Sequence, residues 1–299
     1  MAQDNLLRGI SENGGIVFYG VDSTDIVREM ERVHKTSAVT TAALGRLLTA
    51  SAMMGAMLKN SKDSLTLQIK GGGPAGRLMA VADGEGHVKG YVQNPVVELP
   101  PRADGHLDVG GAVGHDGTLD VIRDMGLREP YIGQVPLVSG EIAEDVTCYF
   151  AISEQTPTVC ALGVLVNEDL SVRYAGGFIV QLLPGALDSE IDQLEKNIAA
   201  MPSVTSMMEQ GKSVRDMLDM ALDTFAPEVL DTSSVVYHCD CSEDRVRRML
   251  KSLGKSEVEK LRDEDPIAEV HCQFCDKTYR IDLKDFIKNW PDTDENKKV

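Results

Sequence analysis

Four of the six cysteines form two closely spaced pairs near the C-terminus, and thiol pairs of this kind bind metals. The first pair is Cys239 and Cys241; after thirty intervening residues the second pair, Cys272 and Cys275, forms a Cys-x-x-Cys knuckle. Two pairs presented from turns can supply four thiolates to one tetrahedral zinc ion, with Zn–S distances of ~2.3 Å. We therefore predict one zinc ion per chain, held by Cys239, Cys241, Cys272 and Cys275.

Two other interpretations of these residues stay open. The four cysteines could be small buried side chains. His238 and His271 lie directly before the two pairs and could replace a cysteine as ligand, although thiolate is the softer donor and each histidine has a cysteine beside it.

Four thiolates fill a tetrahedral shell, so no position remains for a water or a substrate. The spacing therefore predicts a structural metal and disfavours a catalytic one. Metal-bound thiolates can still be oxidised, and each pair could close into a disulfide. The residues alone allow either a folding clamp or a redox switch.

Three further motifs are compatible with chemistry but favour structural roles. The segment 71–76 matches G-x-G-x-x-G, yet a predicted hairpin follows it where a dinucleotide site needs a helix, so we expect a glycine turn. Ser153 could suggest a nucleophile, but no Gly-x-Ser-x-Gly motif surrounds it. We expect Ser153, Glu154 and Gln155 to form the polar end of a strand. The isolated thiols of Cys148 and Cys160 are expected to be core residues.

Composition narrows the class of protein. The 299 residues carry a net charge of −17 with a pI near 4.7, which disfavours binding to nucleic acid. The N-terminus has no basic segment followed by an apolar core, so we expect a cytoplasmic protein. In that reducing compartment its six cysteines are not expected to form structural disulfides. The apolar stretch 38–58 contains Arg46 and is expected to be a buried helix, not a membrane span.

The pattern of strands and helices predicts an α+β fold with three parts: a core domain with a mostly antiparallel sheet (1–185), a helical linker (186–232) and a zinc-binding module (233–299). We expect helices at 36–59 and from 189 onward. The expected strands are 15–19, 64–70, 77–82, 87–93, 133–138, 146–152, 161–166 and 171–180.

The linker contains few strand signals and has a local net charge of −7. Its short, self-repelling amphipathic helices depend on packing against other parts of the protein. Its methionines are expected either to pack in a core that adapts to its surroundings or to form a surface that binds varied partners. In the module we expect helices at 243–253 and from a capping box at 256–259, strands at 268–270 and 277–281, and a frayed tail at 292–299.

Several segments resemble the bacterial thirty-three-kilodalton heat-shock protein, a family of redox-regulated holdase chaperones. The resemblance covers nearly the whole chain. It rests on the ordered Cys-x-Cys and Cys-x-x-Cys ending and on the blocks 65–74 (LTLQIKGGGP), 153–157 (SEQTP) and 176–185 (GGFIVQLLPG).

This resemblance implies a non-enzymatic chaperone that works without ATP and is inactive while zinc occupies the four cysteines. Hypochlorite, or peroxide with heat, would oxidise the thiolates and release zinc. The module and linker would then unfold, and the protein would bind unfolding clients as a homodimer. We expect the redox-active pairs to be Cys239 with Cys241 and Cys272 with Cys275, because cysteines within one short turn have the higher effective concentration. Cross-pairing is the alternative.

Two other classes of function remain to be distinguished. A zinc-ribbon nucleic-acid module would need a basic stripe, but the segment 239–299 has a balance of −2. A thiol oxidoreductase would use Cys272 and Cys275 and would turn over a disulfide substrate. A holdase would instead suppress aggregation stoichiometrically.

Overall fold

The computed structural model describes residues 4–290 of the chain, which separate into two compact units, one ending at His238 and the other beginning at Cys239. The expected frayed tail, 292–299, lies outside the described residues. Of the described helices, none combines the length and the apolar character that a bilayer span requires.

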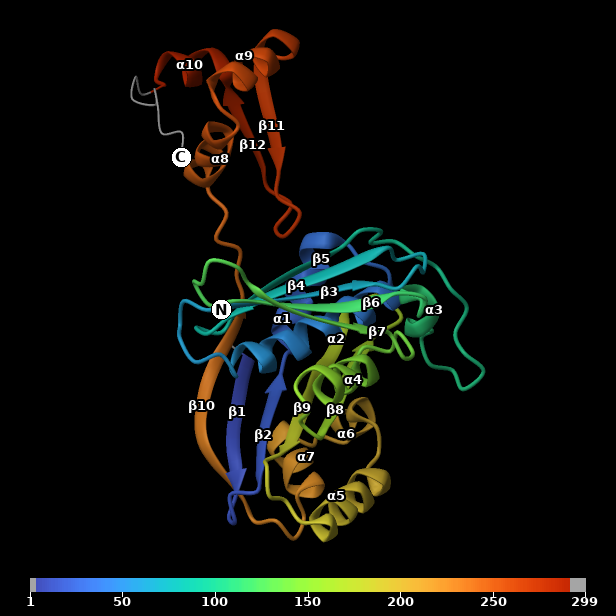
Figure 1. The fold of residues 1–299 in the computed structure, drawn as a ribbon. Coiled ribbons are helices and arrows are strands. Elements are labelled where there is room, and N and C mark those ends of the chain that lie inside the picture. Colours follow the sequence, from blue (N-terminus) through green and yellow to red (C-terminus); the bar gives the residue numbers. More distant parts are fainter. Residues whose placement is uncertain (1–3, 291–299) are drawn as a thin grey trace. The chain divides into compact units, whose positions relative to one another are not determined.

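The first unit is built on a ten-stranded sheet that is antiparallel except for one short parallel pairing, so the predicted α+β class is confirmed. In Figure 1 the strands from β3 to β7 form one half of the sheet, and β1, β2, β8 and β9 form the other. The strands in spatial order are β7 (Tyr131–Pro136), β6 (Thr118–Asp124), β3 (Ser64–Lys70), β4 (Arg77–Asp83), β5 (His87–Val92), β10 (Pro227–Tyr237), β1 (Asp4–Ser11), β2 (Ile16–Asp22), β9 (Val172–Leu182) and β8 (Thr158–Val166).

A buried helix, α2 (Ala38–Gly55), packs against strands of both halves and confirms the helix expected there. Small residues permit this close approach: a Cβ on Gly55 would lie 2.9 Å from Ala82 of β4, and a Cβ on Gly45 would lie 3.0 Å from Val164 of β8. The charge of Arg46 is neutralised by Glu141 at 2.5 Å. The remaining helices of this part are α1 (Thr24–His34), α3 (Val109–Val113) and α4 (Ala143–Ser153).

The strand expected at 146–152 is wrong, because this segment forms α4. Its β-branched and aromatic residues suit a strand, but Val146, Tyr149 and Phe150 are buried on one face at helical spacing. Asp145 organises the start of the helix, since its carboxylate accepts hydrogen bonds from the amides of residues 138, 139, 140 and 142. The polar residues 153–155 therefore lie at a helix end, not at a strand end.

The glycine segment 71–76 is the expected tight turn, and it joins β3 to β4. Gly72 and Gly76 have φ values of 78° and 69°, the region that favours glycine. The amides of Gly73 and Ala75 each donate to a carbonyl oxygen of the α3 segment at 2.9 Å. Because these amides are already bonded within the protein, the turn does not present them to a phosphate.

The linker segment forms three short helices, α5 (Asp188–Ala200), α6 (Val204–Glu209) and α7 (Val214–Ala221). They cover one face of β2 and β9, where buried side chains of helices and strands form a separate apolar core. The helical prediction fails at the end of this segment, because residues 227–237 form β10. This strand pairs antiparallel with β1 along most of its length and parallel with β5 at Val236 and Tyr237.

The second unit contains α8 (Glu243–Ser252), α9 (Lys255–Glu264), β11 (Ile267–His271), β12 (Thr278–Asp282) and α10 (Leu283–Lys288). The expected capping box is wrong: α9 begins one residue earlier, after Gly254 at φ 89°, and no side chain caps it. The fully packed core of the described unit consists of six side chains, namely Val246, Leu250, Val258, Ile281, Leu283 and Phe286.

Candidate metal centre

The two cysteine pairs lie in two connecting segments of the second unit. Cys239 and Cys241 precede α8, and Cys272 and Cys275 lie in the turn between β11 and β12. That turn is closed by two backbone hydrogen bonds of 2.9 Å, from the amide of Cys272 to the carbonyl of Lys277 and from the amide of Asp276 to the carbonyl of Cys272. The turn therefore presents both sulfurs from one rigid knuckle.

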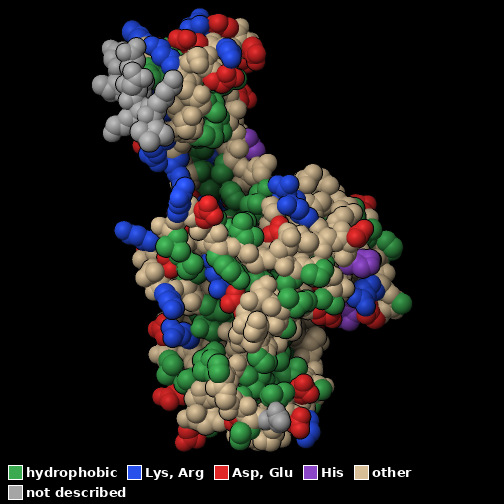
Figure 2. Space-filling view, in the orientation of Figure 1, with side chains coloured by type: hydrophobic (Ala, Val, Ile, Leu, Met, Phe, Trp, Pro, Cys, Tyr) green, Lys and Arg blue, Asp and Glu red, His purple; other side chains and the backbone are tan. Residues whose placement is uncertain are grey.

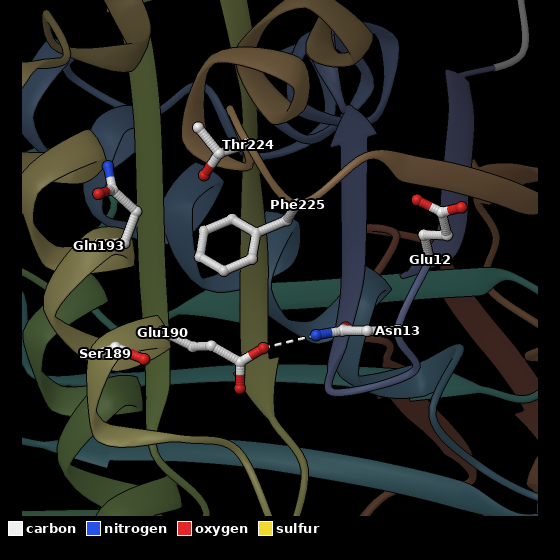
Figure 3. Close-up of a pocket in the computed structure, with 7 residues that line it drawn as sticks. All are labelled: Glu12, Asn13, Ser189, Glu190, Gln193, Thr224 and Phe225. Carbon is white, nitrogen blue, oxygen red and sulfur yellow. Dashed lines mark hydrogen bonds between the residues drawn. The ribbon is translucent and has the colours of Figure 1, made fainter.

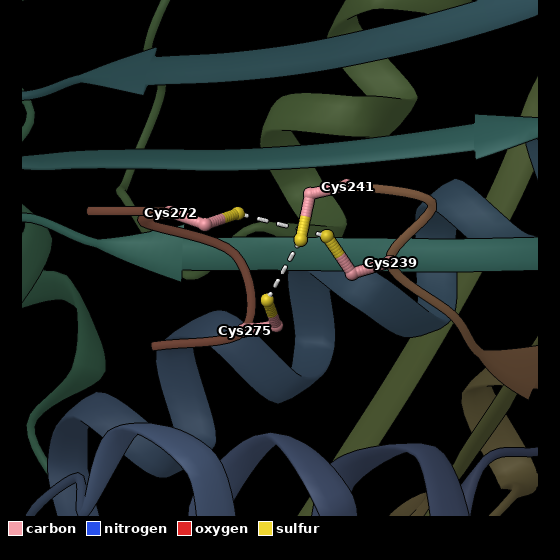
Figure 4. Close-up of side chains that lie close together, drawn as sticks. All are labelled: Cys239, Cys241, Cys272 and Cys275. Carbon is pink, nitrogen blue, oxygen red and sulfur yellow. Dashed lines mark hydrogen bonds between the residues drawn. The ribbon is translucent and has the colours of Figure 1, made fainter. Parts of the chain in front are cut away.

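The structure brings all four predicted sulfurs together. They lie within 4.8 Å of one another and point toward a common centre (Figure 4). The Sγ atoms of Cys239 and Cys272 are 3.7 Å apart, and those of Cys241 and Cys275 are 3.2 Å apart. All four cysteines are free thiols in this state.

This arrangement fits a tetrahedral metal ion. Zn–S bonds of ~2.3 Å place neighbouring sulfurs about 3.8 Å apart, close to the spacing found here. Among residues 4–290, the group of four thiols is the cluster with the donor types and proximity that a metal needs. The donor set is all sulfur, which selects a soft or borderline ion such as zinc.

The electrostatics of the thiols also favour a cation at this place. Burial raises the pKa of Cys241, but hydrogen bonds from Tyr279 and from the other cysteines offset this effect and lower the pKa to about 7. Burial and hydrogen bonding to neighbouring sulfurs raise the pKa values of Cys239 and Cys275. Four close thiols cannot all ionise without a positive ion between them, because like charges repel.

The two histidines weighed as alternative ligands lie outside this cluster. The Nε2 atom of His271 is 3.1 Å from a carboxylate oxygen of Asp276. The ring of His238 lies beside that of His87 in the first unit, with centroids 4.8 Å apart. Within the described residues, the geometry therefore favours the four-cysteine set over a mixed one.

The remaining candidate groups of the sequence are placed in structural roles. Burial raises the pKa of the Cys160 thiol on β8, which keeps it protonated and unreactive. Cys148 is half-buried on α4. Glu154 accepts a hydrogen bond of 2.6 Å from the hydroxyl of Tyr149 and pairs with Arg123 at 3.1 Å, so it ties α4 to β6.

One residue near the cluster was not predicted. The hydroxyl oxygen of Tyr279, on β12, lies 3.1 Å from the Sγ atom of Cys241. The strand around Tyr279 was expected from its pattern, but a strand pattern does not say which distant side chain an outward-facing hydroxyl meets. The only available signal was the position of a tyrosine shortly after the Cys-x-x-Cys knuckle.

A surface pocket of 450 Å³ lies elsewhere, in the first unit, between the β1–β2 turn, the start of α5 and the segment before β10 (Figure 3). The side chain of Asn13 donates to Glu190 across it at 2.5 Å. The lining contains the hydroxyls of Ser189 and Thr224, but it contains no histidine, lysine or cysteine that could activate them as nucleophiles. The hydrogen bond between Asn13 and Glu190 joins α5 to the β1–β2 turn, and the lining does not suggest catalysis.

Comparison with known proteins assigns a family to this fold and site. A family model described as Hsp33 protein matches residues 4–282. A 33 kDa chaperonin of Clostridioides difficile (strain 630) is 50% identical over 286 residues, covering 96% of this chain and 98% of the relative. A 33 kDa chaperonin of Agathobacter rectalis is 48% identical over 278 residues, covering 93% and 96%.

A crystal structure supports the same assignment. The 33 kDa chaperonin (heat shock protein 33 homolog) from Thermotoga maritima has a TM-score of 0.88 at 37% identity, covering 96% of this chain and 98% of that one. Fold and site define an α+β protein with a four-cysteine cluster in a small C-terminal unit. The chain belongs to the Hsp33 family of chaperones, as the sequence resemblance indicated.

Proposed function

We propose that this protein is an ATP-independent holdase that is inactive while reduced and zinc-bound, and that oxidation of its four cysteines activates it to bind unfolding proteins. One observation carries the proposal: a cluster of four free thiols lies in a unit whose own core is very small. Family membership supports the chaperone class, and the cluster supports the redox trigger.

The second unit is too small to be held by its core alone. Units below about 70–80 residues rarely gain more than ~3–5 kcal/mol from a single core, and a structural zinc site contributes an apparent ~10–16 kcal/mol. Cys239, Cys241, Cys272 and Cys275 would hold the ion, which when bound supplies a folding clamp. Loss of the bound ion would remove more stabilising free energy than the net free energy of unfolding of the unit, so the unit would unfold.

The linker helices cover the surface that we assign to client binding. Phe18, Phe178 and Val180 of the sheet are buried beneath Met207, Met217 and Leu218. The strands present glycines here, and a Cβ on Gly20 would lie 2.5 Å from Val214. Helices of six to thirteen residues are marginal without such packing. Their displacement would expose a continuous apolar surface on β2 and β9.

The surface over the linker helices is consistent with an apolar binding face that these helices cover. Figure 2 shows hydrophobic side chains over the linker helices in patches that charged and polar side chains interrupt. Leu187 is 64% exposed and Met220 is 36% exposed, whereas Met207 and Met217 are buried. The methionines of the linker are therefore mostly core in this state, and displacement of the helices would turn them into adaptable contact surface.

Oxidation of the cluster by a peroxide or hypochlorite is a four-electron process for the whole site. Four thiolates lose one electron each, two sulfur–sulfur bonds form, and two equivalents of a two-electron oxidant are reduced. We expect Cys239 to pair with Cys241 and Cys272 with Cys275. The closest sulfurs in the reduced state lie across the two pairs, so cross-pairing is the competing outcome.

The local pairing is expected because each pair belongs to one short segment, which keeps its sulfurs close after the site opens. Peptide mapping of fully oxidised, zinc-free protein should find mainly the disulfides 239–241 and 272–275. Protein unfolded in denaturant before oxidation serves as the control for pairing by proximity alone. A dominant bond between Cys241 and Cys275, or between Cys239 and Cys272, would contradict the prediction and leave the unit stapled.

One titration tests the proposed function. Zinc release, light scattering of a denaturing client and hydrogen exchange of residues 186–232 are followed together as the protein is oxidised. We expect all three to change in the same oxidant range while α2 stays protected. Client capture without zinc release, or a linker that stays protected in oxidised protein that holds clients, would refute the proposed coupling.

The finer features of the proposal follow from the family resemblance. We propose a homodimer in the activated state, a cytoplasmic location, and unfolded or oxidatively damaged proteins as partners. We propose no enzymatic role and no binding to nucleic acid or membranes.

A further inference from the structure

The four sulfurs of the cluster differ in the donors that face them. The sulfurs of Cys239 and Cys272 lie 3.7 Å apart, and those of Cys241 and Cys275 lie 3.2 Å apart. The sulfur of Cys241 also meets the phenol hydroxyl of Tyr279, at 3.1 Å. This contact is a side-chain hydrogen bond between β12 and the segment before α8.

The direction of this hydrogen bond depends on the state of the sulfur. A free thiol can donate or accept, but a thiolate has no proton, so in the ligating state the hydroxyl must donate to the sulfur. A hydrogen bond to an ionised acceptor is about twice as strong as a neutral one. It also draws electron density away from the sulfur, which makes the sulfur a poorer nucleophile.

We propose that Tyr279 is a positioning residue that stabilises Cys241 as a thiolate ligand and slows its reaction with oxidants. The inference rests on the proposed function and adds a residue that sets the sensitivity of the switch. In the reaction concerned, the thiolate sulfur attacks hydrogen peroxide, the O–O bond breaks, and a sulfenic acid and hydroxide form. A second thiolate then displaces hydroxide from that sulfur and completes the disulfide.

The structure distinguishes this role from simple packing. The ring of Tyr279 packs at the margin of the small core of the second unit, so a phenylalanine would preserve that contact. The hydroxyl is the atom that makes the hydrogen bond to Cys241. The variant Tyr279→Phe therefore removes the hydrogen bond and keeps the ring.

The test uses the full-length reduced protein. In Tyr279→Phe we expect zinc affinity, measured by competition with a chelator, to fall about 10- to 100-fold, the usual effect of losing an outer-shell partner of a metal ligand. Zinc release by peroxide should be several-fold faster. In protein loaded with cobalt, the sulfur-to-cobalt charge-transfer band should move to longer wavelength, because the sulfur becomes more electron-rich.

Two controls keep the test interpretable. Tyr131→Phe removes a phenol hydroxyl from β7 in the first unit and should change none of these readouts. A monofluorinated tyrosine in place of Tyr279 keeps ring and hydroxyl but makes a stronger donor, so the cobalt band should move the opposite way. Trp290, whose ring packs against Phe286 with centroids 5.6 Å apart, reports by its fluorescence whether the metal-loaded variants are folded.

Unchanged zinc affinity together with an unmoved cobalt band in both position-279 variants would overturn the inference. Equal band shifts in the same direction for both variants would also overturn it, because they would reflect a packing change. Failure of the wild-type protein to bind one metal per chain would instead count against the proposed function.

Discussion

Replacing Cys272 with serine is expected to abolish tight zinc binding and to unfold the second unit in the reduced protein. If the apparent ~10–16 kcal/mol of a structural zinc site is shared evenly by four ligands, losing one ligand costs about 2.5–4 kcal/mol, or roughly 70- to 900-fold in affinity. The six-residue core cannot compensate for that loss. Metal analysis should give one zinc per wild-type chain and almost none for Cys272→Ser after dialysis against a chelator.

The unfolding has its own readout. Trp290 is the only tryptophan of the chain and packs at the margin of the second unit's core, so its emission should shift to longer wavelength in Cys272→Ser. Cys148→Ser is the matched control, because Cys148 lies on α4 in the first unit. Two zinc ions per wild-type chain, or unchanged affinity in Cys272→Ser, would contradict the four-cysteine assignment.

Replacing Gly20 with valine is expected to displace the linker helices without oxidation. The new Cβ alone would lie 2.5 Å from Val214 and 2.9 Å from Leu218, so these side chains must shift or α7 must move away from β2. Valine itself suits a strand, which should preserve the sheet. Overpacking costs about 1–3 kcal/mol, which corresponds to a roughly 5- to 150-fold larger fraction of molecules with α7 displaced.

This prediction separates the linker from the metal site. Reduced Gly20→Val should suppress client aggregation while it still holds one zinc per chain, and the amides of α7 should exchange faster. Gly15→Val is the control, because the nearest neighbour of a Cβ at Gly15 would be the side chain of Asn13, at 3.4 Å. If α7 exchanges rapidly in reduced Gly20→Val and no client is captured, the binding surface lies elsewhere on the protein.

The parts of the fold that could be predicted were those with a local cause. The hairpin of β4 and β5 has alternating patterns on both sides of a turn, and the buried helix α2 has a long run with little charge and many small residues, so both predictions were confirmed. The strands β1 and β6 were missed: β1 has few β-branched residues, and β6 carries the buried Asp120. Their strand conformation depends on partners distant in the sequence, which periodicity does not reveal.

Tertiary context also overruled two local signals. The segment 146–152 has strand-like residues, but the carboxylate of Asp145 and the burial of one helical face make it α4. The segment 227–237 is largely exposed and has a polar run at 231–234, and pairing with β1 makes it β10. In both cases long-range packing or hydrogen bonding exceeds a propensity of about 1 kcal/mol or less per residue.

The sequence by itself determined which residues are candidates for the metal site, because the identity of the four cysteines and their spacing within two short segments are local properties. Only the tertiary structure decided what surrounds them. It brought the hydroxyl of Tyr279 to Cys241 and laid the linker helices against the glycines of β2 and β9. Those contacts join residues far apart in the chain, and their free energy depends on shape and distance, which residue types alone do not specify.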